Sequence, residues 1–234
     1  IGAGGIGMSA LVRYFLSKDI KVGGYDRTSS ELTERLIEEG ACIHFKDDIK
    51  LIPSEFLQKE STLIIYTPAI PESHSELTFF RNNGFEIQKR SQVLGMLTQS
   101  GKGLCVAGTH GKTTTSTMAA HLLHQSTIGC NAFLGGISKN YGTNLLLSDK
   151  SEYIVIEADE FDRSFHWLTP YATVITATDA DHLDIYGTKE AYLESFSHYT
   201  SLIKPNGALI MREGIELSPQ LQTRSRSRLP QMRS

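Results

Sequence analysis

A glycine-rich loop that follows an apolar run and precedes a helical pattern is the feature that most constrains the fold. Residues 106–114 have the sequence VAGTHGKTT and overlap the apolar run of residues 103–107. In such a loop the side chain of Lys112 can reach the β- and γ-phosphates of a nucleotide, and the hydroxyl of Thr113 can ligate Mg²⁺. The helix that follows directs its first amide groups at the phosphates. The segment therefore predicts a strand, a phosphate loop and a helix that bind ATP.

This loop departs in one respect from the usual pattern G-x-x-x-x-G-K-[ST]. Val106 stands where the first glycine is expected, and Gly108 lies three residues before Gly111 instead. His110 can contact a phosphate or can simply pack the loop, and the sequence favours neither role. The predicted ATP-binding residues are Gly108, Thr109, His110, Gly111, Lys112, Thr113 and Thr114.

The rest of the chain alternates between short β-branched runs and helical patterns, which is typical of an α/β protein with parallel sheets covered by crossover helices. The expected strands are 21–25, 62–66, 103–107, 153–157, 172–176 and 208–211. The expected helices are 9–17, 30–39, 75–82, 92–98, 112–125 and 189–202. We place a domain boundary in the polar stretch near residue 100, so that residues 1–100 form a Rossmann-like domain and 101–216 form part of a P-loop domain.

A second glycine pattern opens the chain. Residues 2–7 fit G-x-G-x-x-G and lead into a helix, and Asp26 lies at the end of the next expected strand. Glycines at a strand-to-helix turn let the backbone approach a diphosphate, and an acid at that strand end can bind a ribose or a base. Residues 67–70 follow another strand and belong at the same sheet edge. The pattern predicts a nucleotide or diphosphate site, and an NAD(P)-dependent oxidoreductase remains an alternative.

Acidic clusters follow two of the strands in the second half of the chain. Residues 157–160 (EADE) end one apolar strand, and residues 179–184 (DADHLD) follow another. Both clusters lie at strand carboxyl ends, on the edge where Lys112 also emerges. Because Mg²⁺ prefers oxygen ligands, we expect these clusters to supply the metal site.

Composition excludes several classes of protein. The net charge of −3 comes from 23 basic and 26 acidic residues. Residues 217–234 contain four arginines and no acidic residue, so residues 1–216 are more acidic than the chain as a whole. Such an acidic surface is unsuited to binding nucleic acid. We expect 217–234 to form a disordered basic tail. No apolar run approaches the roughly 20 residues of a membrane span. The three cysteines suggest neither a disulfide framework nor a zinc site, and we expect a cytoplasmic protein.

Together these strings resemble the Mur ligase family of ATP-dependent amide ligases, which act in peptidoglycan precursor synthesis. The strings GTHGKTTT, EADE and DADHLD occur in the family's order and approximate spacing, and the resemblance covers residues 1 to about 220. The N-terminal string GAGGIGMSALVRYF is most similar to the members that add L-alanine, whose pattern is usually GIGGIGMS. Ala3 is a mild departure from that pattern.

The resemblance implies roles for individual residues. The first domain would bind the UDP part of a sugar nucleotide rather than NAD. The implied UDP-sugar-binding residues are Gly4, Gly5, Ile6, Gly7, Met8, Ser9, Asp26, Thr67, Pro68, Ala69 and Ile70. Glu157 and His182 would join Thr113 as metal ligands, and Lys112, Glu157 and His182 would be the catalytic residues. Residues 131–144 would form a loop on the substrate side.

The implied reaction joins L-alanine to UDP-N-acetylmuramate. ATP would convert the muramyl carboxylate into an acyl phosphate, which the amine of L-alanine then attacks, with Mg²⁺ as the cofactor. A ligase that adds a preformed tripeptide to the same sugar nucleotide is an alternative. Family members also carry a third domain for the amino acid, so we expect the 234-residue chain to be a truncated form with little or no turnover. An assay for phosphate release that depends on L-alanine and UDP-N-acetylmuramate would measure this turnover.

Overall fold

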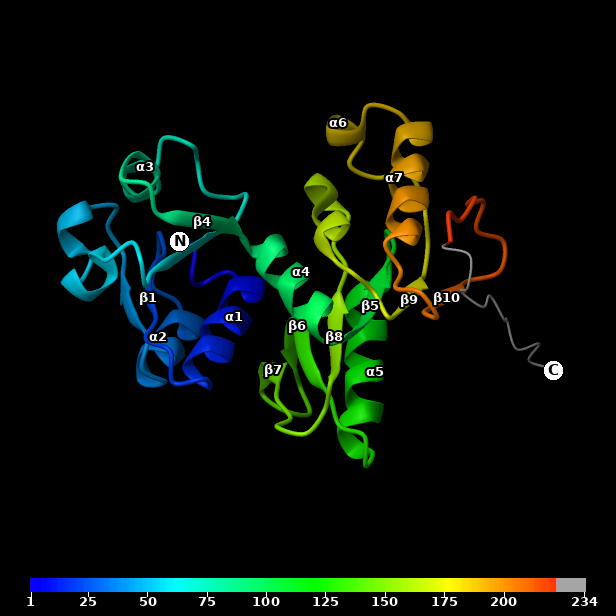
Figure 1. The fold of residues 1–234 in the computed structure, drawn as a ribbon, viewed down its shortest axis with the longest axis horizontal. Coiled ribbons are helices and arrows are strands. Elements are labelled where there is room, and N and C mark those ends of the chain that lie inside the picture. Colours follow the sequence, from blue (N-terminus) through cyan, green and yellow to red (C-terminus); the bar gives the residue numbers. More distant parts are fainter. Residues whose placement is uncertain (222–234) are drawn as a thin grey trace. The chain divides into compact units, whose positions relative to one another are not determined.

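The computed structural model describes residues 1–221, which form two compact units. The first unit is Ile1–Val93, and the second begins at Leu94. The division falls within helix α4 (Arg90–Ser100), slightly before the boundary that the sequence predicts near residue 100. Figure 1 labels the helices and strands of both units.

The first unit contains two separate parallel strand pairs. Strand β1 (Gly23–Tyr25) pairs with β2 (Cys42–His44), and β3 (Leu63–Tyr66) pairs with β4 (Glu86–Lys89). The helices are α1 (Ile6–Leu16), α2 (Glu31–Glu38), η1 (Ile49–Leu51), η2 (Ser54–Leu57), α3 (Ser75–Asn82) and the first residues of α4. Helix α2 begins where the sequence allows a cap, since Ser30 accepts a hydrogen bond from the amide of Thr33.

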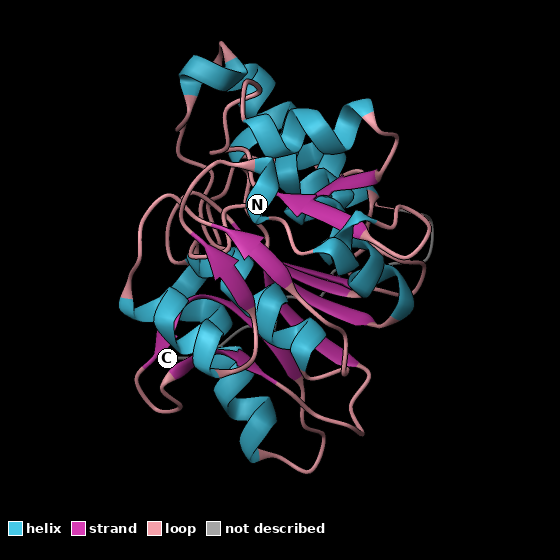
Figure 2. Ribbon diagram, turned by 90° about the vertical axis from the view of Figure 1, so that its left-hand side faces the viewer, coloured by secondary structure: helices cyan, strands magenta, loops and turns pink. Residues whose placement is uncertain are grey.

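The second unit is built on a six-stranded sheet with the order β10-β9-β5-β8-β6-β7. The strands are β5 (Lys102–Ala107), β6 (Asn131–Ser138), β7 (Thr143–Leu146), β8 (Tyr153–Glu157), β9 (Ala172–Ile175) and β10 (Ala208–Met211). The helices are α5 (Lys112–Gln125), η3 (Phe161–Trp167), α6 (Leu183–Tyr186) and α7 (Lys189–Ser201). In Figure 2 the strands run side by side with helices packed against them. All neighbours pair in parallel except β7, which is antiparallel to β6.

The structure confirms every expected strand and helix, with ends that shift by a few residues, but it adds elements that the sequence analysis missed. Strands β2 and β4 are short and only partly buried, so they lack an apolar signal. The expected loop over 131–144 is wrong, because most of that segment forms β6 and the start of β7. The expected α/β fold with parallel sheets is confirmed, and β7, which the sequence did not predict, is the antiparallel exception.

The three cysteines are free in the structure. Burial raises the pKa of the Cys105 thiol to about 12 and that of Cys130 to about 11, so both stay protonated at neutral pH. Cys42 is exposed on β2.

No helix within residues 1–221 combines the length and the apolar character that a membrane crossing needs. Most of the expected disordered tail, 222–234, lies outside the described residues. Within its described part, the amide of Gln220 donates to Thr200 Oγ1 on α7 at 2.8 Å.

Candidate functional site

The predicted phosphate loop joins the end of β5 to the start of α5 in the second unit. Gly108 has φ = +129°, a conformation that side chains rarely adopt, and a Cβ there would lie 2.8 Å from the backbone nitrogen of Ala177. Gly111 has φ = +81° and stands directly before helix α5, which has no side-chain cap. The loop therefore presents a bare helix N-terminus, which suits a phosphate group.

Lys112 makes a buried ion pair at the base of this loop. Its ammonium donates to the carbonyl of Gly108 at 2.9 Å and lies 2.8 Å from Glu160 Oε2. The Glu160 side chain is 1% exposed and lies three residues after the end of β8. Glu160 belongs to the acidic cluster 157–160, and its pairing with Lys112 was not predicted from the sequence. The contact holds the Lys112 side chain back against the loop.

The predicted metal residues Thr113 and Glu157 lie together. The hydroxyl of Thr113 donates to both carboxylate oxygens of Glu157, at 3.1 and 3.0 Å. Glu157 ends β8 and packs so closely on Gly135 of β6 that a Cβ on that glycine would collide with its carboxylate. A hydroxyl and a carboxylate beside a phosphate loop form a donor set that suits Mg²⁺.

The other residues of the loop differ in whether their side chains are held by hydrogen bonds or exposed to solvent. Thr109 hydrogen-bonds through its hydroxyl to the carbonyl of Asp179 at 2.7 Å and to the hydroxyl of Tyr192 at 2.9 Å. The side chain of His110 is 71% exposed, with Nε2 3.9 Å from an Asp179 carboxylate oxygen. Thr114 is exposed at the start of α5. Thr109 thus ties the loop to the segment after β9, whereas His110 and Thr114 remain accessible.

His182 is not joined to the pair of predicted metal residues. It has φ = +52° and stands directly before α6, and its ring packs edge-on against the ring of Phe161, with 5.3 Å between the centroids. Its Nε2 lies 3.8 Å from an Asp181 carboxylate oxygen. Across residues 1–221, no three His, Cys, Asp or Glu side chains gather into a group that could hold a metal. The structure therefore brings together Thr113 and Glu157 only.

The N-terminal glycine loop of the first unit is held by the predicted acid. The amide of Gly4 donates to Asp26 Oδ2 at 2.7 Å. A Cβ on Gly2 would lie 2.6 Å from the methyl group of Thr67 and 3.5 Å from Ile70 Cδ1. The loop, Asp26 and the segment 67–70 thus gather at one edge of the strands, as the sequence predicts, and one oxygen of Asp26 serves to hold the loop.

Helix α1 follows this loop after Gly5, again without a side-chain cap. The side chains of Met8 and Ser9 are buried, and Ser9 donates to the carbonyl of Ile6 at 2.8 Å. Contacts of these two residues with a ligand would therefore use their backbone. Pro68 and Ala69 are exposed in their loop.

Arg90 is a candidate that the sequence analysis missed. A Cβ on Gly7 would lie 2.9 Å from Arg90 Cζ, so the guanidinium packs over the first turn of α1. A cation there adds to the positive end of the helix dipole, which suits a diphosphate. Arg90 follows β4 directly. The sequence does not predict that strand, so nothing in it marks Arg90 as a residue at a strand carboxyl end.

Two family descriptions match the chain. The description "Mur ligase family, catalytic domain" matches residues 1–102, and "Mur ligase middle domain" matches residues 106–231. The second match includes most of the segment 217–234, which the sequence analysis separates from the family resemblance.

Curated relatives give high identity over part of their length. The chain is 78% identical over 222 residues to UDP-N-acetylmuramate–L-alanine ligase of Phocaeicola vulgatus, covering 95% of this chain and 48% of the relative. The protein of the same name from Parabacteroides distasonis is 65% identical with the same coverage. The chain spans about half the length of these relatives.

Solved structures share the fold and agree with the family descriptions. UDP-N-acetylmuramate-alanine ligase from Thermotoga maritima is 27% identical, with a TM-score of 0.79 and coverage of 93% of this chain and 49% of that one. A UDP-N-acetylmuramate:L-alanyl-gamma-D-glutamyl-meso-diaminopimelate ligase from Neisseria meningitides has a TM-score of 0.82 at 22% identity, covering 92% and 70%. With both family descriptions matched in order along it, the chain belongs to the Mur ligase family.

Proposed function

We propose that this chain supplies the sugar-nucleotide-binding and ATP-binding parts of an enzyme that joins L-alanine to UDP-N-acetylmuramate. The observation that carries the proposal is the grouping of Lys112, Thr113 and Glu157 at the phosphate loop of a chain 78% identical to a ligase of that name. The reaction needs ATP because a carboxylate is a poor acyl donor at neutral pH. Transfer of the γ-phosphate would give an acyl phosphate, and the amine of L-alanine would displace phosphate from it.

The phosphate loop would act by placement and charge. The ammonium of Lys112 would leave Glu160 and contact the β- and γ-phosphates. The first amides of α5 would donate hydrogen bonds to the phosphate oxygens. Thr113 and Glu157 would hold Mg²⁺, which neutralises charge on the phosphoryl group. His182 stays a proposed ligand, since its described contacts are with Asp181 and Phe161.

The first unit would bind the UDP part of the substrate. Asp26 would keep the glycine loop open for the diphosphate by holding the amide of Gly4, and Arg90 would neutralise the diphosphate. The alternative of an NAD(P)-dependent oxidoreductase leaves the phosphate loop of the second unit without a role. The three free cysteines suit the reducing cytoplasm, where we place the chain.

Separate titrations of the 234-residue chain test the proposal. Calorimetry with Mg-ATP and with UDP-N-acetylmuramate should show two independent binding events. Lys112→Ala should remove only the first event, and Gly4→Asp only the second, because Gly4 lies against Asp26. Binding of NADH in place of the UDP-sugar, or retention of both events in both variants, would contradict the proposal.

Glu157→Gln should lower the affinity for ATP at limiting Mg²⁺ by about tenfold, because the amide removes one anionic ligand. The difference in ATP affinity between Glu157→Gln and the unsubstituted chain should be smaller when ATP is titrated without Mg²⁺. Glu152→Gln is a matched control, since Glu152 lies near the other end of β8 and pairs with Lys102 on the surface. Equal effects of the two substitutions would argue against a metal site at Glu157.

Arg90→Ala should weaken UDP-N-acetylmuramate binding by about tenfold through loss of a charge-assisted contact, and Arg90→Lys should recover part of it. Isothermal titration at two salt concentrations measures both the loss and its electrostatic origin. Arg81→Ala is the control, because Arg81 pairs with Glu72 at the surface of the same unit. A normal affinity in Arg90→Ala would remove Arg90 from the site.

A further inference from the structure

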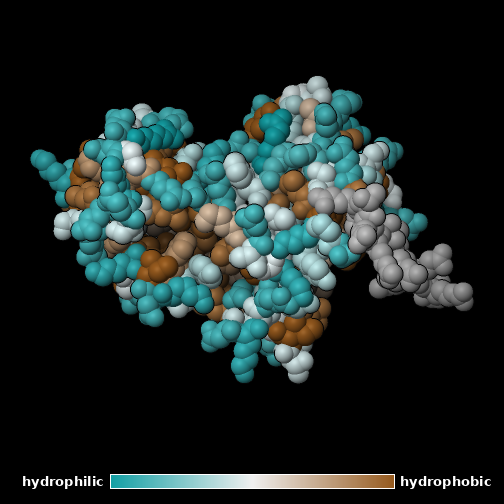
Figure 3. Space-filling model, viewed as in Figure 1, coloured by the Kyte–Doolittle hydropathy of each residue, from teal (hydrophilic) through white to brown (hydrophobic). Residues whose placement is uncertain are grey.

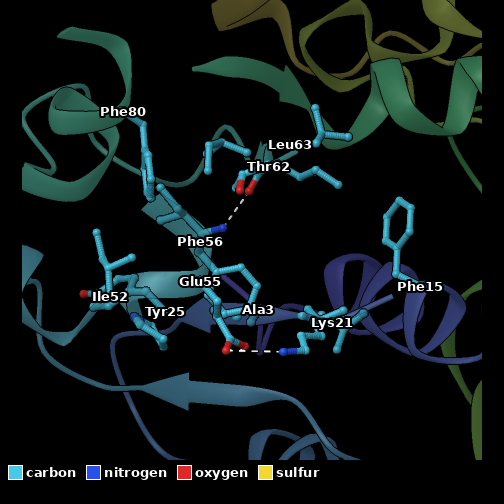
Figure 4. A pocket seen from close by; sticks show the side chains of 18 of the residues that line it. Ala3, Phe15, Lys21, Tyr25, Ile52, Glu55, Phe56, Thr62, Leu63 and Phe80 are labelled. Carbon is cyan, nitrogen blue, oxygen red and sulfur yellow. Dashed lines mark hydrogen bonds and ion pairs between the residues drawn. The ribbon is translucent and has the colours of Figure 1, made fainter. Parts of the chain in front are cut away.

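Three tyrosines are buried in the second unit. The side chains of Tyr186, Tyr192 and Tyr199 are at most 5% exposed, and each hydroxyl has a hydrogen-bond partner. The first unit instead contains a cavity of about 630 Å³ with a largely apolar lining, which includes Phe56 and Phe80 (Figure 4). Apolar side chains also gather on the face of that unit seen in Figure 3. Because burying a hydroxyl is costly unless it is bonded, the partner of each tyrosine shows what that tyrosine holds.

Tyr192 lies in the first turn of α7 and holds the phosphate loop through Thr109. The hydroxyl of Thr109 donates to the carbonyl of Asp179 at 2.7 Å, so its single proton is already used. The hydroxyl of Tyr192, 2.9 Å from Thr109 Oγ1, is therefore the donor in the bond between them. Burial raises the pKa of Tyr192 and keeps this proton in place at neutral pH. A relay of two directed hydrogen bonds thus runs from α7 through the loop to the segment after β9.

Tyr199 makes a second relay of the same kind at another place. It lies seven residues after Tyr192, about two turns further along α7. Its hydroxyl is 2.8 Å from Thr173 Oγ1 of β9, and Thr173 donates to the carbonyl of Cys105 in β5 at 3.1 Å. Both tyrosines are 0% exposed. One relay therefore fastens α7 to the sheet, whereas the other fastens α7 to the phosphate loop.

The backbone of the loop is also fastened to the segment after β9. The amide of Thr109 donates to the carbonyl of Ala177 at 3.1 Å. The hydroxyl of Thr176 donates to the carbonyl of His110. These partners and Asp179 all belong to residues 176–179, so the position of the loop depends on that one segment unless another element supports it.

Helix α7 supplies that support from the core of the unit. The ring of Tyr192 packs on the rings of Tyr186 and Phe196, with 4.9 and 5.1 Å between the centroids. A side chain packed in this way can hold Thr109 in one place. A loop that is held before its ligand arrives loses less conformational entropy on binding.

We propose that Tyr192 is a positioning residue for ATP, which acts through Thr109 to hold the phosphate loop in the shape that receives the phosphates. This inference rests on the proposed function, since it takes the loop to bind Mg-ATP. Tyr192 would not touch the nucleotide, because its side chain is 0% exposed and its hydroxyl is bonded to Thr109. Without this bond the loop would open more often, and the apparent affinity would fall with the fraction of molecules whose loop is closed.

Tyr192→Phe and Tyr199→Phe in the full chain test the proposal, since each removes one hydroxyl and keeps the ring. Both should lower the folding constant in urea titrations by about tenfold, because each leaves a threonine oxygen without its donor. Only Tyr192→Phe should also lower the affinity for Mg-ATP, by about fivefold in calorimetry. Affinity for UDP-N-acetylmuramate should stay unchanged in both variants. Equal ATP affinities in the two variants would overturn the proposal.

A double substitution tests whether Tyr192 acts through Thr109. Thr109→Val keeps the shape of the side chain but removes the hydroxyl that receives the bond. In that background, Tyr192→Phe should change the ATP affinity by less than about twofold, because the bond is already lost. A further fivefold loss would show that Tyr192 acts by a route other than Thr109.

Hydrogen exchange without nucleotide tests the same device independently of ATP. The amide of Thr109, which donates to Ala177, should exchange at least about tenfold faster in Tyr192→Phe than in Tyr199→Phe. Equal rates would mean that Tyr192 does not hold the loop. A chain that bound UDP-N-acetylmuramate but no Mg-ATP would overturn the proposed function of the loop, and the exchange rates would then decide alone whether Tyr192 holds it.

Discussion

Lys112→Ala is expected to reduce the affinity for Mg-ATP at least about 100-fold, equivalent to about 2.8 kcal/mol, and also to destabilise the second unit. The affinity falls because the only cation of the loop is lost. Stability falls because the substitution leaves Glu160, with a side chain 1% exposed, without the ammonium that lies 2.8 Å away. An unpaired buried carboxylate costs on the order of 3 kcal/mol. Calorimetry and urea unfolding measure the two effects separately.

The double substitution Lys112→Met with Glu160→Gln separates these two roles of Lys112. Because it removes both charges while keeping similar side-chain volumes, it should recover most of the stability lost in Lys112→Ala. It should not recover ATP affinity, since the phosphates still lack their cation. If ATP affinity returned together with stability, Lys112 would be a structural residue alone.

Gly108→Ala is expected to destabilise the second unit by about 3 kcal/mol and to remove ATP binding. The backbone at Gly108 has φ = +129°, and the added methyl group would meet the Thr176 hydroxyl and the backbone of Ala177. These neighbours lie in the segment directly after β9, so they cannot move without disturbing the sheet edge. Urea unfolding and ATP titration at a temperature where the variant is folded are the measurements.

Gly142→Ala is the matched control for this prediction. Gly142 also has a positive φ, +65°, but a Cβ there would meet nothing within 4 Å. Its cost should stay near 1 kcal/mol, the strain of the backbone alone. Equal losses at Gly108 and Gly142 would mean that the contacts at the sheet edge contribute nothing.

The sequence predicts the phosphate-loop region well because its geometry is encoded locally. Glycines at fixed spacing, a preceding apolar run and a following helical pattern specify β5, the loop and α5, and the expected helix 112–125 matches Lys112–Gln125 at both ends. Thr113 and Glu157 lie close together because β5 and β8 are parallel neighbours: Glu157 ends β8, and the phosphate loop that leads to Thr113 follows the end of β5.

The remaining features depend on tertiary contacts that leave little trace in the sequence. Glu160 approaches Lys112 only because β8 and β5 are neighbours, and the acids of 157–160 look alike in the sequence. Arg90 reaches Gly7 from the end of β4, a strand whose residues EIQK carry a weak apolar pattern. Strand β6 contains two adjacent glycines, which favour a loop until neighbouring strands supply the ladder.

The burial of two of the three thiols makes the chain a selective target for alkylating reagents. Cys105 and Cys130 lie in the second unit with raised pKa values, so they offer little thiolate, whereas Cys42 is exposed on β2 in the first unit. A maleimide dye applied to the native protein would therefore attach to the first unit alone. The fluorescence of the dye would report on unfolding of the first unit. The rate at which Cys105 and Cys130 become reactive would report on opening of the second unit.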